Sequence, residues 1–182
     1  LRWWFVDRGM DMWDFLVGRF VMDTWCASLF YRLMGARVHL FTRINAPLRE
    51  LDLVTIGAHT TVDHQIRCRK FGPWEDEKGP TMQLRPIEIG KKCQIESLVS
   101  PGASIGDECH VKKFAVVVKG AQVPSNVIAA GNPAVNSGEN KWEDNKHWLG
   151  LCLLEIAKML WLIVELYIVF GLFFVSQVAW RE

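Results

Sequence analysis

The segment Ile89 to Pro133 repeats every six residues, and this period constrains the fold more than any other feature of the chain. Aliphatic residues recur in steps of six, with one shorter step of four: Ile89, Ile95, Val99, Ile105, Val111, Val117 and Val123. Two residues before most of them stands a small residue: Cys93, Ser97, Ala103, Cys109, Ala115 and Ala121. Neither an α-helix nor an ordinary hairpin sheet has a period of six, so the pattern indicates a repeat architecture.

A six-residue period predicts short strands separated by turns, in which three strands close one triangular coil of roughly eighteen residues. The aliphatic residue fills the interior of the coil, the small residue fits the crowded corner, and a glycine such as Gly90 or Gly106 takes the turn. Stacked coils then bury a continuous core that no single coil can bury. We therefore predict an all-β parallel β-helix over residues 36–135; ordinary edge strands with turn residues are the alternative.

Composition excludes several classes of protein. The formal net charge of the 182 residues is +1, so there is no electrostatic basis for binding nucleic acid. The five cysteines are odd in number and lack a Cys-x-x-Cys pair, which argues against a disulfide framework and a zinc ribbon. A reducing, cytoplasmic-type compartment is expected. The chain begins at Leu1 within an apolar run that lacks signal-peptide architecture, so we interpret it as a piece of a longer protein.

Apolar segments flank the repeat on both sides. Residues 1–35 are apolar and aromatic with scattered charges, and Met12 to Met34 is predicted to be helical, with Gly35 as its C-terminal cap. These charges disfavour a bilayer span. We expect a membrane-associated helix that packs on other membrane helices or lies in the interface. A buried helix of a larger soluble domain is the alternative.

A second apolar helix is predicted at residues 148–182, after a polar linker at residues 136–147. Its five polar residues, Glu155, Lys158, Glu165, Ser176 and Gln177, fall within one arc of roughly 120°. Its length of roughly 50 Å exceeds the hydrocarbon core of a bilayer, and Trp148 and Trp180 stand near its ends. We therefore expect a membrane helix, and membrane lipid as a partner; an amphipathic helix packed on a partner protein is the alternative.

Residues 69–83 interrupt the repeat with glycine, proline and charged residues, which predicts a loop. Trp74, Glu75 and Asp76 within it are candidates for contacting an amino-bearing or cationic substrate. Long loops that leave a regular solenoid often carry function. A tolerated surface insertion is an equally reasonable interpretation.

Several motifs in the repeat resemble those of known enzymes. Pro86-Ile87-Glu88-Ile89-Gly90, Val99 to Asp107, and Val123-Pro124 followed by Ala130-Gly131-Asn132-Pro133-Ala134 are similar to the closing coils of the hexapeptide-repeat acyltransferases. That resemblance implies a left-handed β-helix. The layout of β-helix and apolar helices also resembles the membrane-attached C-terminal segments of poly-lysine-synthetase-type nonribosomal peptide synthetases.

The resemblance implies an acyl transfer from a coenzyme A or phosphopantetheine thioester to a hydroxyl or amine. In such enzymes the donor lies in a groove between neighbouring β-helices, which implies other copies of this β-helix as a homotrimer or an intrachain pseudo-trimer. Lys112, Lys113 and Lys119 are the candidates for contacting the donor phosphates; exposed, solubilising lysines are the simpler interpretation. Phe114 stands where these enzymes have a small residue, and is expected to narrow the groove.

One histidine is expected to act as the general base. His64 precedes the loop and the Pro86 coil, roughly where the resemblance places the base, and is the first candidate. His59 is the runner-up. His39 remains open, His110 is expected in solvent beside a turn, and His147 lies in the linker. Asp63 is not expected to orient His64, because neighbours on a strand point to opposite faces.

Two other classes of function remain open. His59 and His64 are five residues apart, as in a zinc site of the γ-class carbonic anhydrases, but the other ligands are missing, so no metal is expected. The β-helix is also interpretable as a non-catalytic docking or assembly module, with chemistry done by adenylation and carrier domains of a parent chain.

Overall fold

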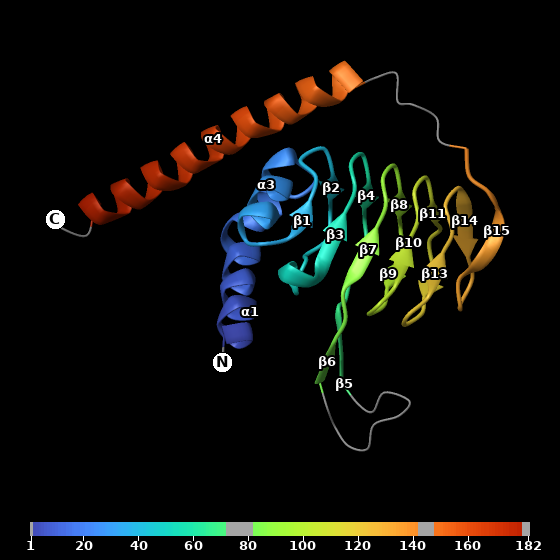
Figure 1. Cartoon of the computed structure of the whole chain (residues 1–182). Coiled ribbons are helices and arrows are strands. Elements are labelled where there is room, and N and C mark those ends of the chain that lie inside the picture. Colours follow the sequence, from blue (N-terminus) through green and yellow to red (C-terminus); the bar gives the residue numbers. More distant parts are fainter. Residues whose placement is uncertain (1, 72–81, 142–147, 180–182) are drawn as a thin grey trace. The chain divides into compact units, whose positions relative to one another are not determined.

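The computed structural model describes residues 2–71, 82–141 and 148–179. The chain divides into two compact units, Leu1–Glu143 and Asp144–Glu182. The first contains short strands wound around one core, and the second contains a single helix (Figure 1).

Short strands of the first unit stack into three sheets, which we call faces A, B and C. Face A contains β1 (Arg37–Val38), β3 (Val54–Ile56), β7 (Ile87–Ile89), β10 (Ser104–Ile105) and β13 (Gln122–Val123). Face B contains β2 (Arg43–Ile44), β4 (Thr61–Val62), β8 (Gln94–Ile95), β11 (His110–Val111), β14 (Val127–Ala130) and β15 (Val135–Glu139). Face C contains β9 (Leu98–Val99) and β12 (Val116–Val117), with Ile66 bridged to Val99. The chain passes from A to B to C and returns to A, so it forms a parallel β-helix, as predicted.

The register places each coil directly on the one before it. Arg37 pairs with Thr55 and Ser104 with Gln122, a separation of eighteen residues in both cases. The separation widens to thirty-three between Thr55 and Glu88, because the segment after the second coil leaves the stack there. It shortens to sixteen between Glu88 and Ser104.

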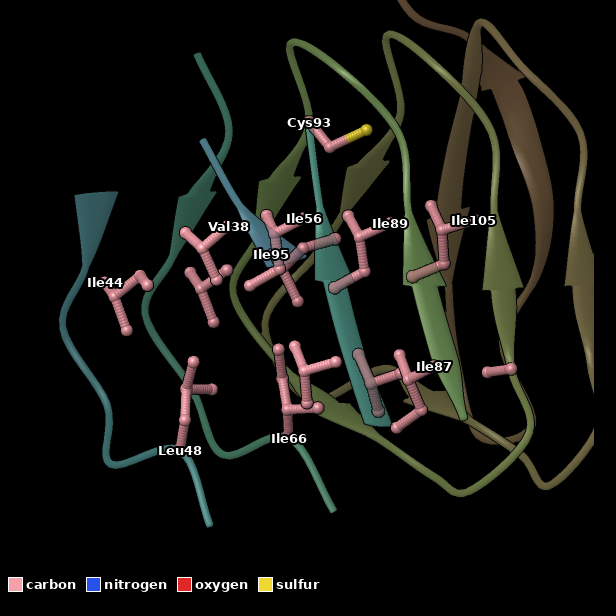
Figure 2. Packing of buried hydrophobic residues seen from close by; sticks show 14 of the residues in the cluster. Val38, Ile44, Leu48, Ile56, Ile66, Ile87, Ile89, Cys93, Ile95 and Ile105 are labelled. Atoms are coloured by element: carbon pink, nitrogen blue, oxygen red, sulfur yellow. The ribbon is translucent and has the colours of Figure 1, made fainter. Parts of the chain in front are cut away.

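Aliphatic side chains fill the interior of the coils (Figure 2). Ile89, Ile95, Ile105, Val111 and Val117 are buried, and Val123 in the last coil is partly buried against the same core. The inward direction predicted from the six-residue period is confirmed.

The small corner residues are also buried, except that Ala121 is partly buried, and several corner side chains donate hydrogen bonds between coils. Thr60 Oγ1 donates to the Gly90 carbonyl at 2.8 Å, Cys93 Sγ to that of Gly106 at 3.0 Å, and Cys109 Sγ to that of Pro124 at 3.0 Å. The two thiols therefore have a structural role, as interior residues that link one coil to the next.

The recurrent glycines serve a different purpose from the one predicted. Gly90 and Gly106 are absent from the positive-φ residues, whereas His59, Lys92 and Glu108 adopt φ of 58°, 54° and 56° in the turns. A Cβ on Gly90 would lie 2.7 Å from the backbone carbonyl carbon of Gly106 and would also collide with Asp107 Oδ1. Glycine is required because neighbouring coils approach too closely for a side chain.

We expect Gly90→Ala to destabilise the β-helix by about 1–3 kcal/mol, because two backbones must separate to admit the methyl group. The shift of the thermal unfolding midpoint measures this effect. Gly9→Ala is the matched control: it lies in helix α1 with nothing within 4 Å of the added Cβ. There alanine should be neutral or stabilising. Equal stability of Gly90→Ala and the parent chain would contradict the close-approach explanation.

The N-terminal region is not the single helix predicted for Met12 to Met34. It contains α1 (Arg2–Trp13), a π-helical turn (Asp14–Gly18), α2 (Arg19–Val21) and α3 (Trp25–Leu33), with a break at residues 22–24. α3 does end at Gly35, which has a φ of 108°, as predicted. The break arises because Asp23 turns its backbone N–H to the carbonyl of Ile44 at 2.9 Å, a contact that a continuous helix would forbid.

These helices cover the open end of the first coil (Figure 1). Ala27, Ser28 and Tyr31 of α3 are buried, and Ser28 Oγ donates to the Thr42 carbonyl at 2.5 Å. Burial raises the pKa of Tyr31 to about 12, so its hydroxyl stays protonated at neutral pH. Terminal repeats of a solenoid need such a cap because their outer face would otherwise expose the core.

An ion-pair cluster ties α1 to the coils. Arg49 lies 2.5 Å from Asp11 and 3.3 Å from Asp14, and Arg69 lies 3.3 Å from the buried Glu50. The N-terminal helical region also exposes several aromatic residues: Trp4, Phe5, Phe15, Phe20 and Trp25. The region is thus part of the first unit, and its predicted membrane association remains a proposal.

Two boundaries differ from the predicted ones. The ends of the predicted loop 69–83 form an antiparallel ribbon of β5 (Arg69–Phe71) and β6 (Met82–Leu84), because leaving the stack frees both segments to pair with each other. Residues 136–139 of the predicted linker belong to β15, which pairs antiparallel with β14. β15 thereby covers the outer edge of the last strand of face B.

The second unit contains α4 (Trp148–Ala179), one continuous helix as predicted. Within it, Leu153–Phe173 is long and apolar enough to cross a membrane by length and composition. Trp161 Nε1 donates to Glu165 Oε1 at 2.7 Å, which gives this carboxylate a partner on its own helix.

Candidate functional site

The corner between faces B and C is shorter in the first three coils than in the fourth. The buried residues on either side of it are four positions apart in Ile44 and Leu48, in Val62 and Ile66, and in Ile95 and Val99. In the fourth coil the corresponding pair, Val111 and Val117, is six apart. Lys112, Lys113 and Phe114 occupy the longer corner, which we call the corner ledge; all three are exposed, Phe114 by 92%.

A hollow of about 780 Å³ lies at this corner, and we call it the corner hollow. Its lining comes from successive coils: Asn45, Asp63, His64, Glu96, Ser97, Leu98, Lys113, Phe114, Ala115 and Val116. The short corners form its base, and the corner ledge borders it. The single step of four seen in the sequence is thus one of three stacked short corners that create the hollow.

His64, the first candidate for the general base, lines the corner hollow and is exposed. Its Nδ1 accepts a hydrogen bond from the backbone N–H of Gln65 at 2.9 Å. The neutral ring therefore carries its proton on Nε2. In this arrangement Nε2 is a donor and not an acceptor, so the ring must turn or change tautomer before Nε2 can accept a proton.

Two carboxylates share the hollow with His64. Burial raises the pKa of Asp63, the carboxylates of Asp23 and Glu96 raise it further, and Lys113 lowers it. Glu96 Oε1 accepts from Gln94 Nε2 at 2.7 Å. A site with two carboxylates beside an imidazole is suited to an acceptor that carries an amine or another cation.

Asp63 and His64 do not point to opposite faces, contrary to the expectation from strand alternation. β4 ends at Val62, so both residues lie in the corner and line the same hollow. Sequence reasoning missed Asp63, Asn45, Glu96 and Ser97 as site residues. The four-residue step between Ile95 and Val99 is a signal in the sequence that could have located this corner.

Only one of the three candidate lysines meets the hollow. Lys113 lines it, whereas Lys112 and Lys119 are not among its lining residues. Phe114 also lines the hollow, and its narrowing of a donor groove stays a prediction. Contact of these residues with a donor remains a prediction.

None of the described residues of the predicted substrate loop lines the corner hollow. Trp74, Glu75 and Asp76 lie outside the residues that the structure describes. The ribbon leaves the stack after Cys68, at the other end of face C from His64, and its described strands do not line the hollow.

The remaining histidines are dispersed. His59, the runner-up, lies at the A–B corner before β4, where its ring stacks on Phe41 at 5.9 Å between centroids. His110 is on face B, with Nε2 3.7 Å from Glu96 Oε1. His59 and His64 therefore stand at opposite ends of β4. No cluster of three or more His, Cys, Asp or Glu able to hold a metal occurs within residues 2–71, 82–141 and 148–179.

Comparison with known proteins supports the resemblance drawn from the motifs, although no protein-family model matches the sequence. Over 107 residues the chain is 33% identical to an Escherichia coli K12 protein provisionally named colanic acid biosynthesis acetyltransferase WcaF, covering 58% of this chain and 53% of that protein. The polySia specific acetyltransferase NeuO is similar in structure at 23% identity, with 51% and 55% of the two chains covered and a TM-score of 0.42.

A third similar structure is the hexapeptide-repeat-containing acetyltransferase VCA0836 of Vibrio cholerae O1 biovar eltor, complexed with acetyl coenzyme A. The two chains are 16% identical in sequence, and the similarity covers 56% of this chain and 64% of that chain with a TM-score of 0.39. The chain spans about half the length of the curated relatives it matches. Their activity, substrates and partners therefore extend to this chain only as a proposal.

Proposed function

We propose that this chain is an acyltransferase-like module that moves an acyl group from a coenzyme A or phosphopantetheine thioester to a hydroxyl or amine. The observation that carries the proposal is His64, which faces the corner hollow beside Asp63, Glu96 and Lys113. The similarity to a protein named as an acetyltransferase, over 107 residues, supports the same reaction class.

In the proposed reaction, Nε2 of His64 removes the proton from the acceptor as its oxygen or nitrogen attacks the thioester carbonyl. The carbon–sulfur bond then breaks, and the leaving thiolate takes up the proton as a free thiol. The Gln65 N–H must first release Nδ1, and Nδ1–H then needs an acceptor. A donor groove shared with a neighbouring left-handed β-helix, in a homotrimer or an intrachain pseudo-trimer, would bring further groups to the hollow.

A transfer assay with the full chain in detergent tests the proposal. Radiolabelled acetyl-coenzyme A is offered with a panel of amine and hydroxyl acceptors, and labelled product is counted after separation. We expect label to reach at least one acceptor, with amines favoured because of the two carboxylates. No transfer from acetyl-coenzyme A or from a carrier-bound thioester would contradict the proposal.

A second function, non-catalytic docking or assembly, is favoured by one observation. The hydrogen bond from Gln65 N–H to Nδ1 satisfies His64 in the tautomer that a general base does not use. In that case the β-helix would hold adenylation or carrier domains of a longer, synthetase-like protein, and the corner hollow would receive part of such a partner.

We further propose that α4 attaches the module to a membrane, with the β-helix in a reducing, cytoplasmic-type compartment. The apolar segment Leu153–Phe173 supports membrane attachment. The free, buried thiols Cys68, Cys93 and Cys109 agree with a reducing compartment.

Shortening the chain to end at Asn140 is expected to convert a detergent-requiring protein into one that stays in solution without detergent. The reason is that removing α4 removes its exposed apolar surface, while β15 up to Glu139 is retained. Ultracentrifugation of both versions in detergent-free buffer is the measurement. If the shortened chain sediments as much as the full chain, α4 is not the cause of membrane association.

A further inference from the structure

A second hollow, of about 630 Å³, lies where the N-terminal cap meets face A, and we call it the N-terminal hollow. It is formed by the end of α3, by β1 and by the turns that follow β3 and β7. Its lining is Arg32, Ala36, Arg37, Val38, His39, Ile56, Gly57, Ala58 and Lys91. This region belongs neither to the corner hollow nor to the ribbon.

All ionisable side chains in this lining are basic: Arg32, Arg37, His39 and Lys91. Among the described ion pairs, none includes Arg32, Arg37 or Lys91, and all three side chains are exposed. The carboxylate of Asp107 accepts from the backbone N–H of Lys91 at 2.7 Å, and is not part of the lining. The hollow therefore concentrates positive charge in a chain whose net charge is only +1.

His39 adds a directed donor to this charge. Its Nδ1 accepts from the backbone N–H of Phe41 at 3.3 Å, so the neutral ring carries its proton on Nε2. Guanidinium groups supply paired N–H donors whose geometry matches phosphate oxygens. Two arginines, a lysine and a histidine around one hollow are suited to an anion of the phosphate type.

Four exposed apolar residues are chain neighbours of two lining residues, and we call them the apolar rim. Leu33 and Met34 follow Arg32 in the chain, and Leu40 and Phe41 follow His39. Leu33 is 78% exposed and Phe41 67% exposed. Exposed apolar residues beside exposed basic side chains are typical of surfaces that meet lipid headgroups and the upper acyl chains.

We propose that the N-terminal hollow binds the phosphate of an anionic phospholipid, with Leu33, Met34, Leu40 and Phe41 entering the headgroup region. Charge complementarity selects the anionic headgroup, and the apolar rim selects a lipid over a soluble phosphate. The proposal rests on the membrane attachment proposed above, through which α4 would give the chain access to such lipids. The proposal is independent of acyl transfer.

Native mass spectrometry of the full chain, released from detergent micelles, tests this site. The probes are dioleoyl phosphatidylglycerol, dioleoyl phosphatidylcholine and the soluble glycerol 1-phosphate. We expect the parent chain to retain phosphatidylglycerol more tightly than phosphatidylcholine. Arg37→Gln and Lys91→Gln should each weaken phosphatidylglycerol binding by about fivefold, the usual effect of one basic residue at an anionic surface.

Arg67→Gln is the matched control, because Arg67 is an exposed arginine outside this lining, with Nε held by Gln65 at 2.9 Å. It should bind phosphatidylglycerol as the parent chain does, and lipid bound by α4 contributes equally to every variant. Leu33→Ser, on the apolar rim, should weaken binding of phosphatidylglycerol but not of glycerol 1-phosphate.

Three results would overturn the proposal. Unchanged phosphatidylglycerol binding by the Arg37→Gln/Lys91→Gln double variant would exclude the hollow as the site. Equal retention of phosphatidylcholine would exclude recognition of the anionic charge. Glycerol 1-phosphate bound as tightly as phosphatidylglycerol would assign the hollow to a soluble phosphate compound instead of a lipid.

Discussion

His64→Ala is expected to lower acyl transfer by roughly two to four orders of magnitude while leaving the β-helix folded. An imidazole can accept a proton from an acceptor and release it again, which makes His64 the general-base candidate among the residues that line the corner hollow. Its side chain is exposed at a corner and contributes nothing to the core. The turnover number for the best acceptor found in the transfer assay is the quantity to measure.

Two further variants separate the role of His64 from loss of shape. His64→Gln keeps a hydrogen-bonding side chain but cannot accept the proton, so it should be as slow as His64→Ala. His59→Asn removes the runner-up histidine at the opposite end of β4, and asparagine tolerates the φ of 58° at that turn. It should retain activity. Unchanged turnover in His64→Ala would remove His64 from the mechanism, and loss of activity only in His59→Asn would transfer the role to His59.

Val111→Asp is expected to destabilise the β-helix by more than about 4 kcal/mol, which is enough to unfold most domains. Val111 is fully buried and pairs in register with Ile95 on one side and Ala129 on the other. The new carboxylate would enter a dry interior formed by aliphatic side chains. A charge without a partner in that environment is strongly disfavoured, whether it stays ionised or takes up a proton.

Thiol accessibility measures this effect in the full chain without interference from α4. Cys93 and Cys109 have no exposed surface, so a thiol reagent reaches them only after the coils open. In Val111→Asp we expect both to react at once. Lys112→Asp is the matched control, because the same residue is introduced one position along, at an exposed side chain. Protected thiols in Val111→Asp would show that Val111 does not face the core.

The architecture was predictable because a six-residue period is a local property. Each coil places its own aliphatic residue inward, as Ile89, Ile105 and Val123 show, so the inward direction requires no knowledge of distant residues. α4 was predictable for a similar reason, since length and composition alone define an apolar helix. The N-terminal helices were not, because their break at Asp23 depends on a contact with Ile44.

The candidate site was predictable only in part. His64 was identified from its place before the interruption, but Asp63 and Glu96 were not identified as its neighbours. They are separated by thirty-three positions in the sequence, and only the parallel register between β4 and β8 brings their corners together. The loop at 69–83 was expected beside His64, yet its described strands leave from the other end of face C.

The sequence by itself determined the stacked coils, their buried residues and the continuous helix α4. It also determined that Cys93 and Cys109 are small interior residues with a structural role. The tertiary structure alone decided why Gly90 is glycine, where the two hollows lie, and which proton His64 carries. The physical reason is the same in each case. Burial follows from the repeat within one coil, whereas close approach, cavities and hydrogen-bond partners depend on how separate coils and the N-terminal cap are placed against one another.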